Sequence, residues 1–257
     1  DALSTKLSEQ NGTEVTGVLV GDMLHPRASL GSETATGEAI ALGELTLLAP
    51  VKPGKFIGLW NNYKAAAEKG GMQHPEHPLY FCKADTSLIG QGGQVVIPPS
   101  AGRVIFEGEL GVVIGQTCKN ITPEQAEDAI FGYTCINDFT SIDILHADPS
   151  FPQWTRAKSF DGFGVAGPVI ETDFDWRDLT TKVLVNDRER QSYPAADMIL
   201  SPAQIVSCLS KDMTLHAGDL IACGTSVGAR PVKAGMTVDV LIEGIGRVGV
   251  TMAAPQT

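Results

Sequence analysis

One segment constrains the local structure of this chain more than any other. The run from Val104 to Ile114 alternates its side chains in the way that a β-strand requires, and it places Glu107 and Glu109 two positions apart. Since successive side chains of a strand point to opposite faces, both carboxylates are expected on one face. The opposite face, expected to be buried, carries Phe106, Leu110, Val112 and Ile114. The segment therefore predicts a strand with one acidic face and one apolar face.

The two glutamates form a candidate metal site together with Asp138, which follows in the stretch Tyr133-Thr-Cys-Ile-Asn-Asp. Neighbouring carboxylates repel each other, so each resists ionisation unless a cation lies between them. Three carboxylates make an all-oxygen set that suits Mg²⁺ or Mn²⁺. The spacing alone leaves one alternative open, in which the pair occupies the solvated face of an ordinary edge strand.

The composition indicates an acidic globular protein. Among 257 residues there are 19 Lys and Arg against 30 Asp and Glu, which gives a net charge of −11. This sign argues against nucleic acid or an anionic membrane surface as a partner. No apolar run reaches the roughly 18 residues that span a bilayer, and the first residues show no signal-peptide pattern. Five dispersed cysteines without a Cys-x-x-Cys pair predict reduced thiols and a cytoplasmic location.

Strand signals outnumber helix signals and do not alternate regularly with them. Strands are expected at residues 55–60, 79–82, 95–97, 104–114, 179–185 and 238–242. Short helices are expected at about residues 62–69 and after Thr122 and Ser201, each of which is followed by a proline at the first helical position. The pattern predicts an α+β fold rather than a doubly wound parallel sheet. We expect a small β-rich N-terminal section over residues 1–52 and a main domain over residues 53–252.

Motifs spread over residues 55–250 together resemble the C-terminal catalytic domain of the fumarylacetoacetate hydrolase superfamily. They are Asn62-Tyr63, Pro78–Lys83, Glu107–Gly115, Gly132–Asp138, Lys158–Asp161, Met213–Thr225 and Glu243–Arg247, in the family's order and spacing. The resemblance implies a mixed β-roll or β-sandwich core with a few short flanking helices, and a homodimer. It also implies that Glu107, Glu109 and Asp138 bind Mg²⁺ or Mn²⁺.

The resemblance assigns roles to further residues of this chain. Lys158 matches a catalytic lysine whose ammonium adds positive charge beside the metal. Gly224 and Thr225 match a turn that brings backbone and hydroxyl donors to the substrate. Asp143 matches an acidic position near the metal, where it is expected to contribute to substrate binding without being a ligand. Lys83 either faces the pocket or ends a strand.

Members of this superfamily act on 2-oxo acids and β-diketo acids. They catalyse C–C bond hydrolysis, decarboxylation or enol–keto isomerisation. The resemblance therefore implies a small-molecule oxo acid as substrate, in the catabolism of small organic or aromatic-derived acids, with C–C hydrolysis as the leading expectation. A degenerate relative that binds an oxo acid without turning it over is an alternative, although retention of the three carboxylates and Lys158 argues against it.

The chain departs from the hydrolytic pattern at the residues that activate water. Ala66 and Lys69 stand where hydrolytic members usually carry a histidine and a glutamate, and Ile142 stands where an arginine is common. His74 and His77, in a loop punctuated by prolines, are candidate replacements that would close over the site as a lid. Decarboxylation or enol–keto isomerisation is the alternative to hydrolysis, because these reactions need only a proton to be delivered or moved.

Overall fold

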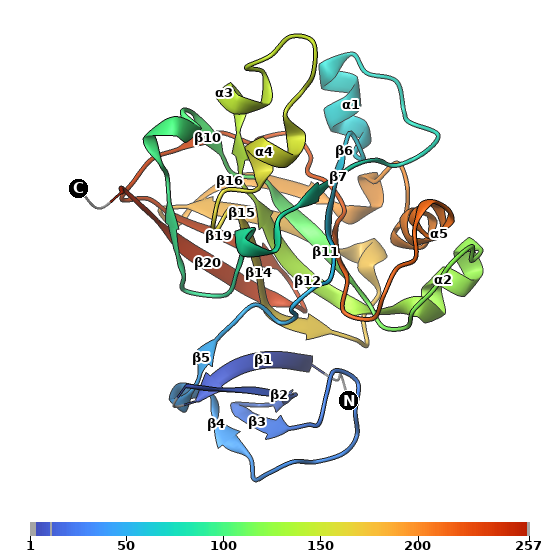
Figure 1. Cartoon of the computed structure of the whole chain (residues 1–257), viewed down its shortest axis with the longest axis vertical. Helices are drawn as coiled ribbons and strands as arrows, with labels where there is room; N and C mark the ends of the chain where they lie inside the picture. Colours follow the sequence, from blue (N-terminus) through green and yellow to red (C-terminus); the bar gives the residue numbers. More distant parts are fainter. Residues whose placement is uncertain (1–3, 11, 256–257) are drawn as a thin grey trace.

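The computed structural model describes residues 4–10 and 12–255, with side chains described from residue 12 onward. Figure 1 shows a small lobe of N-terminal strands below a larger lobe. The strands of the small lobe are β1 (Ser4–Gln10), β2 (Thr13–Val20), β3 (Met23–Pro26), β4 (Ile40–Ala41) and β5 (Thr46–Leu47). Strand β1 also pairs with a strand of the larger lobe, through Thr5 and Ile170, so both lobes share one hydrogen-bonded sheet.

The larger lobe is built on a long mixed sheet. Its members are β6 (Phe56–Trp60), β7 (Leu79–Lys83), β8 (Leu88–Ile89), β11 (Gly108–Ile114), β12 (Ile130–Asp138), β14 (Gly164–Glu171) and β17 (Leu220–Ala222). The strand order runs β4-β3-β2-β1-β14-β12-β11-β17-β6-β7. Strand β11 therefore lies inside the sheet, between β12 and β17, and β7 forms one edge.

A second sheet packs against the first. It has the order β16-β15-β19-β20-β9 and consists of β9 (Gln94–Val96), β15 (Thr180–Val185), β16 (Arg188–Pro194), β19 (Thr237–Ile242) and β20 (Gly246–Ala253). The main core lies between the two sheets, where Leu110 and Val112 of β11 join Val183 and Val240 of the second sheet. The confirmed fold class is α+β, with the mixed, curled β core that the sequence predicted and short flanking helices.

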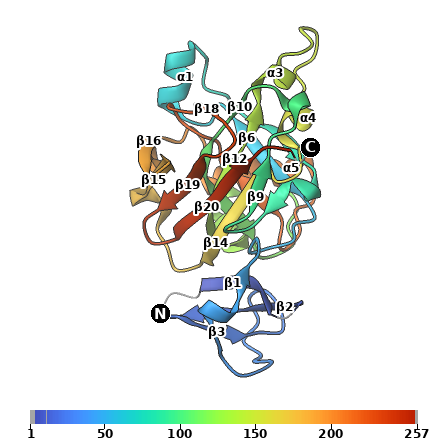
Figure 2. The same cartoon turned by 90° about the vertical axis from the view of Figure 1, so that its left-hand side faces the viewer.

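Within residues 4–10 and 12–255, five short α-helices flank the sheets. They are α1 (Lys64–Gly70), α2 (Pro123–Ala129), α3 (Ile142–Leu145), α4 (Trp154–Lys158) and α5 (Pro202–Asp212). The predicted starts of α2 and α5 are confirmed, because Thr122 and Ser201 each form a complete capping box. Figure 2 shows α1 and α3 at the end of the molecule away from the small lobe, on opposite sides of it. No described helix is long and apolar enough to cross a membrane.

The prediction of one continuous strand from Val104 to Ile114 is wrong. Val104 and Ile105 form β10, which belongs to a separate three-stranded sheet with β13 (Thr140–Ser141) and β18 (Pro231–Val232), and β11 begins only at Gly108. The chain changes sheets at Phe106, whose N–H donates to the carbonyl of Arg230. Every residue of β11 is buried, so the solvated edge strand is also excluded.

The register between β12 and β14 leaves no space for a side chain at Gly132. A Cβ there would lie 2.4 Å from the carbonyl oxygen of Glu171, a backbone atom that cannot rotate away. We predict that Gly132→Ala lowers the free energy of unfolding by about 1–3 kcal/mol, the usual cost of overpacking. Urea titration gives this value. The control is Gly43→Ala, where nothing lies within 4 Å of the added Cβ; equal stability losses in both variants would contradict the described register.

Candidate active site

Three carboxylates meet where the central strand β11 begins and its neighbour β12 ends. The antiparallel register places Gly108 opposite Asn137 and Glu109 opposite Ile136, which brings Asp138 next to the start of β11. One oxygen from each of Glu107, Glu109 and Asp138 lies within 4.8 Å of the others. Glu109 and Asp138 are fully buried. The side chain of Glu107 is 16% exposed, so the cluster opens to solvent on the side of Glu107.

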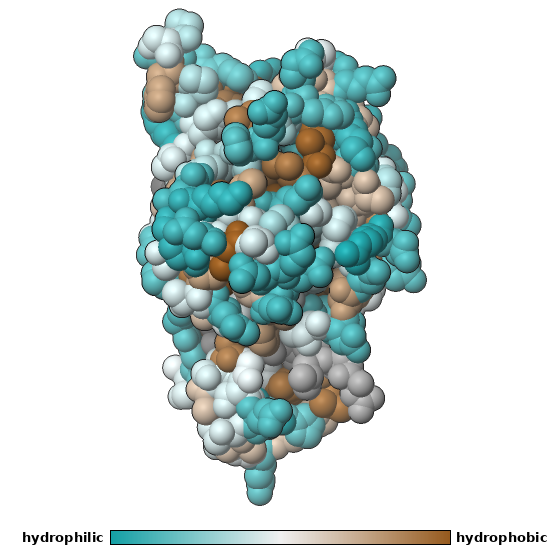
Figure 3. All heavy atoms as spheres, turned by 90° about the vertical axis from the view of Figure 1, so that its right-hand side faces the viewer, coloured by the Kyte–Doolittle hydropathy of each residue, from teal (hydrophilic) through white to brown (hydrophobic). Residues whose placement is uncertain are grey.

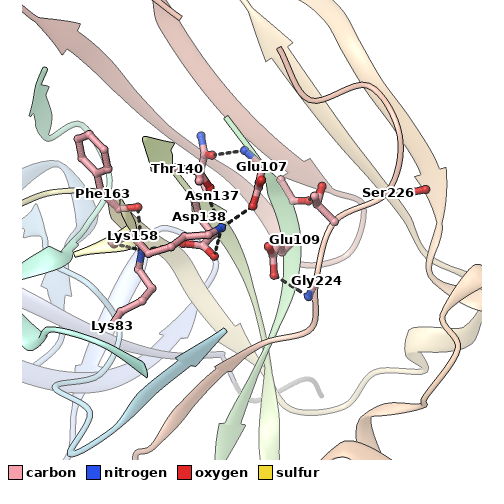
Figure 4. Close-up of polar contacts among 12 residues, drawn as sticks. Lys83, Glu107, Glu109, Asn137, Asp138, Thr140, Lys158, Phe163, Gly224 and Ser226 are labelled. Atoms are coloured by element: carbon pink, nitrogen blue, oxygen red, sulfur yellow. Dashed lines mark hydrogen bonds and ion pairs between the residues drawn. The ribbon is translucent and has the colours of Figure 1, made fainter. Parts of the chain in front are cut away.

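Two buried lysines bind these carboxylates (Figure 4). The Nζ of Lys158 lies 2.5 Å from Oε2 of Glu107 and 2.6 Å from Oδ2 of Asp138. The Nζ of Lys83 lies 2.6 Å from Oδ1 of Asp138 and also donates to the main-chain carbonyls of Lys158 and Phe163. Asp138 therefore lies between two ammonium groups. Lys158 is not a surface lysine, and Lys83, which ends β7, also faces the cluster.

The turn after β17 holds the third carboxylate. The N–H of Gly224 donates to Oε2 of Glu109 over 2.6 Å. Gly224 has a φ of 91°, in the region that favours glycine, and this conformation turns its N–H toward the carboxylate. The other oxygen of Glu109, Oε1, is buried and has no hydrogen-bond partner among the described residues. One carboxylate oxygen is thus held in place beside a second oxygen that lacks a partner.

Burial and the neighbouring charges shift the pKa values of the three carboxylates in different directions. Burial raises the pKa of Glu109 well above its ordinary value, and the neighbouring Asp138 raises it further. Burial also raises the pKa of Glu107, although Lys158 opposes this shift. For Asp138 burial acts in the same direction, but Lys158 and Lys83 outweigh it, so the pKa of Asp138 falls.

The pKa values of the two lysines shift in opposite directions. Burial would lower the pKa of Lys158, but Asp138 and Glu107 outweigh burial and raise it, so Lys158 stays charged. Burial lowers the pKa of Lys83, and Asp138 offsets this only in part.

The donor set fits a divalent cation. Three carboxylates stand against two ammonium groups, so the cluster has room for further positive charge. Oε1 of Glu109 is a buried acceptor without a partner among the described residues, a costly state that a bound cation would relieve. All the available ligand atoms are carboxylate oxygens, which suit Mg²⁺ or Mn²⁺ better than a metal that prefers sulfur.

The remaining predicted residues differ in whether they contact the elements that carry the cluster. The hydroxyl of Thr225 donates to the carbonyl of Gly108 over 2.9 Å, so it fixes the turn beside the start of β11. Asp143 lies on α3 at the surface and pairs with Arg103, its carboxylate 3.3 Å from the guanidinium. His74 and His77 are exposed in the loop between α1 and β7 and make no hydrogen bond within the described chain. The structure thus brings Thr225 to the cluster, but not these three residues.

Sequence reasoning missed the residues that hold the turn at Gly224. The hydroxyl of Tyr193 donates to the carbonyl of Gly108, and Nε2 of Gln191 donates to Thr225 over 3.1 Å. The Nδ2 of Asn62 donates to the carbonyl of Cys223 over 2.9 Å. Gln191 and Tyr193 are two apart on β16, so they share a face. The charged residues that precede them on this strand made the segment look like solvent-exposed surface, so the shared face was not recognised from the sequence.

The fold and the cluster together define a class of β-rich proteins with an acidic, all-oxygen site at one end of two neighbouring central strands. A family model described as fumarylacetoacetate (FAA) hydrolase C-terminal matches residues 55–253. An uncharacterized protein of Archaeoglobus fulgidus is 41% identical over 82% of this chain and 83% of its own length. The chain belongs to the fumarylacetoacetate hydrolase family, as the sequence motifs predicted.

Solved structures support the same assignment over the whole chain. A 5-carboxymethyl-2-hydroxymuconate delta-isomerase from Mycobacterium smegmatis is 32% identical with a TM-score of 0.90, covering 99% of this chain and 100% of that one. A maleylpyruvate hydrolase from Sphingobium sp. SYK-6, in complex with manganese(II) and pyruvate, is 28% identical with a TM-score of 0.80 at the same coverage. Similar structures thus include hydrolases and isomerases, and the predicted class of enzyme is confirmed.

The ion network makes Asp138 a large contributor to stability. We predict that Asp138→Asn lowers the free energy of unfolding by about 3–5 kcal/mol, because Lys83 and Lys158 stay buried after losing a charged partner. Urea unfolding measures the difference. The control is Asp187→Asn, which removes an exposed partner of Arg247 and is expected to change stability little. Equal stability in the two variants would show that the buried pairs are not formed.

Proposed function

We propose that this protein is a divalent-metal-dependent enzyme that acts on 2-oxo acids at a bond to C3. The observation that carries the proposal is the buried cluster of Glu107, Glu109 and Asp138 with the ammonium of Lys158 against it. An excess of buried carboxylate costs stability, and a bound cation would offset that cost. The family relationship supports the same function, because a neighbouring structure holds manganese together with pyruvate, a 2-oxo acid.

Glu107, Glu109 and Asp138 are the residues that would hold Mg²⁺ or Mn²⁺. A bound divalent ion supplies positive charge that polarises the carbonyl of a 2-oxo acid. Gly224 orients Glu109 by its N–H, and Lys83 keeps Asp138 ionised and fixed. These contacts hold the carboxylates before any ligand arrives, which reduces the reorganisation needed on binding.

Lys158 has the position and the charge to assist the chemistry directly. Its pKa is raised by Asp138 and Glu107 against the effect of burial, so it is an ammonium over the physiological pH range. Glu107, which it contacts, is the carboxylate that opens to solvent. An ammonium in this position stabilises the negative charge that develops on the 2-oxo oxygen when a bond to C3 breaks. We propose Gly224 and Thr225 as the turn that borders the substrate.

We infer that the reaction is enol–keto isomerisation or decarboxylation. Hydrolysis needs a base that activates water, and α1 offers only the partly buried Ala66 and the exposed Lys69 at the relevant positions. His74 and His77 are exposed, and no hydrogen bond within the described residues joins either of them to the cluster. A reaction that only moves a proton at C3 needs less from the protein. The isomerase among the similar structures supports this inference, and the maleylpyruvate hydrolase keeps hydrolysis as the second candidate.

The proposal is tested by following oxaloacetate and an acylpyruvate by proton NMR with Mn²⁺ or Mg²⁺, with a chelator as reference. We predict metal-dependent loss of CO₂ or enol–keto exchange. Glu109→Gln should weaken Mn²⁺ binding and lower kcat/KM by more than about a hundredfold. The expected loss is this large because the substitution removes a proposed metal ligand itself, and not a residue that only hydrogen-bonds to a ligand.

The matched control is Glu127→Gln, on the exposed face of α2. Isothermal titration with Mn²⁺ gives the binding readout independently of turnover. Full Mn²⁺ affinity in Glu109→Gln would overturn the metal site. Release of a carboxylic acid with pyruvate or a ketone, dependent on metal, would establish hydrolysis instead.

The lid histidines give a separate prediction. Because the structure leaves His74 and His77 exposed, we expect His74→Ala and His77→Ala each to keep kcat/KM within about twofold, since surface substitutions away from special features have small effects. Steady-state kinetics with the substrate found by NMR measures this. A tenfold or larger loss in either variant would show that the loop closes over the site and supplies the acid–base group.

A further inference from the structure

Three aromatic rings lead outward from the ion cluster, and we call Phe81, Trp154 and Trp60 the aromatic file. The Nζ of Lys158 lies 5.1 Å from the ring centroid of Phe81. The ring of Phe81 stacks on Trp154 at 5.3 Å with an interplanar angle of 9°. Trp154 in turn lies 5.6 Å from Trp60. The file therefore forms a continuous chain of ring contacts that begins at the catalytic ammonium.

The elements that build the ion cluster also build the file. Phe81 and Lys83 are two residues apart on β7, so both point to the same face. Trp154 and Lys158 are four residues apart on α4, which places them one turn apart on one side of the helix. The periodicity that positions each lysine thus fixes a ring beside it.

Strand β6 completes this arrangement through Gly58 and Trp60, which also share a face. A Cβ on Gly58 would lie 2.4 Å from the ring of Phe81 and 3.3 Å from Oδ2 of Asp138. The absence of a side chain there lets the ring lie against the strand beside the carboxylate. The file and the metal cluster are consequently held at a fixed distance by shared backbone.

Exposure rises along the file. Phe81 is 7% exposed, whereas Trp60 is 41% exposed and its cross-strand partner Leu79 is 42% exposed. Figure 3 shows a small group of apolar residues in the upper part of the larger lobe, surrounded by mostly polar surface. Large apolar side chains that are left open beside a polar site are the usual lining of a ligand pocket. The outer end of the file, Trp60 with Leu79, is therefore exposed to solvent.

We propose that the aromatic file binds the apolar end of the substrate, so that this enzyme prefers 2-oxo acids whose chain beyond C3 ends in an aromatic or alkyl group. This inference rests on the proposed function, because the carboxylate and 2-oxo group must bind at the metal cluster. The rings carry no charge to pair with a second carboxylate. Flat rings stack well on indole and phenyl groups.

The test compares binding of 4-phenyl-2-oxobutanoate, pyruvate and 2-oxoglutarate to the Mn²⁺-loaded full chain by isothermal titration calorimetry. The phenyl compound should bind at least about tenfold more tightly than the other two, the gain expected from one good ring contact together with apolar burial. Trp60→Ala should remove most of this advantage and leave the pyruvate affinity unchanged. Trp60→Phe, which keeps a ring, should retain most of it.

The matched control is Trp176→Ala, since Trp176 contacts Arg177 rather than the file and its loss should leave all three affinities unchanged. Equal or weaker binding of the phenyl compound by the unsubstituted protein would overturn the inference while leaving the proposed function intact. That comparison decides the question even if Trp60→Ala does not fold. Failure of all three oxo acids to bind in the presence of Mn²⁺ would instead overturn the proposed function.

Discussion

The candidate active site depends on the ion network around Asp138, a buried carboxylate that lies between the ammonium groups of Lys83 and Lys158. Burying any one of these charges alone would be costly, and each is tolerable because the others are present. The network also joins β12 to β7 and α4, which come from distant parts of the sequence. The same contacts that make the burial possible therefore fix the geometry of the site. They leave Glu109 with one buried oxygen that has no partner in the part of the chain that the structure describes.

Local sequence signals predicted the elements of the site well. Strand alternation places Glu109 and Leu110 on opposite faces, and it can be predicted because it depends only on neighbouring residues. The capping boxes at Thr122 and Ser201 can be predicted for the same reason, since each is complete within four positions. The change of sheet between β10 and β11 escaped prediction, because it depends on a contact between Phe106 and Arg230 that no local pattern encodes. The role of Lys83 was ambiguous for the same reason, since only the fold brings its ammonium to Asp138.

Gln191 and Tyr193 show the limit of sequence reasoning from another direction. Both hold the turn at Gly224 in place, yet neither carries a metal or touches the carboxylates, and their strand reads as a charged surface segment. Residues that act by positioning others have few chemical signatures in sequence. The aromatic file is similar, because Trp60, Phe81 and Trp154 look like ordinary core residues until the structure shows that they form one series ending at an exposed ring.

The most direct test of the central claim is anomalous diffraction from crystals grown with Mn²⁺ and oxalate, an inert analogue of a 2-oxo acid. The account predicts one strong manganese peak in contact with carboxylate oxygens of Glu107, Glu109 and Asp138, with oxalate completing the coordination on the side of Lys158. A cluster without a manganese peak, in crystals where the metal binds elsewhere on the chain, would contradict the account and leave the buried carboxylates as a structural ion network alone.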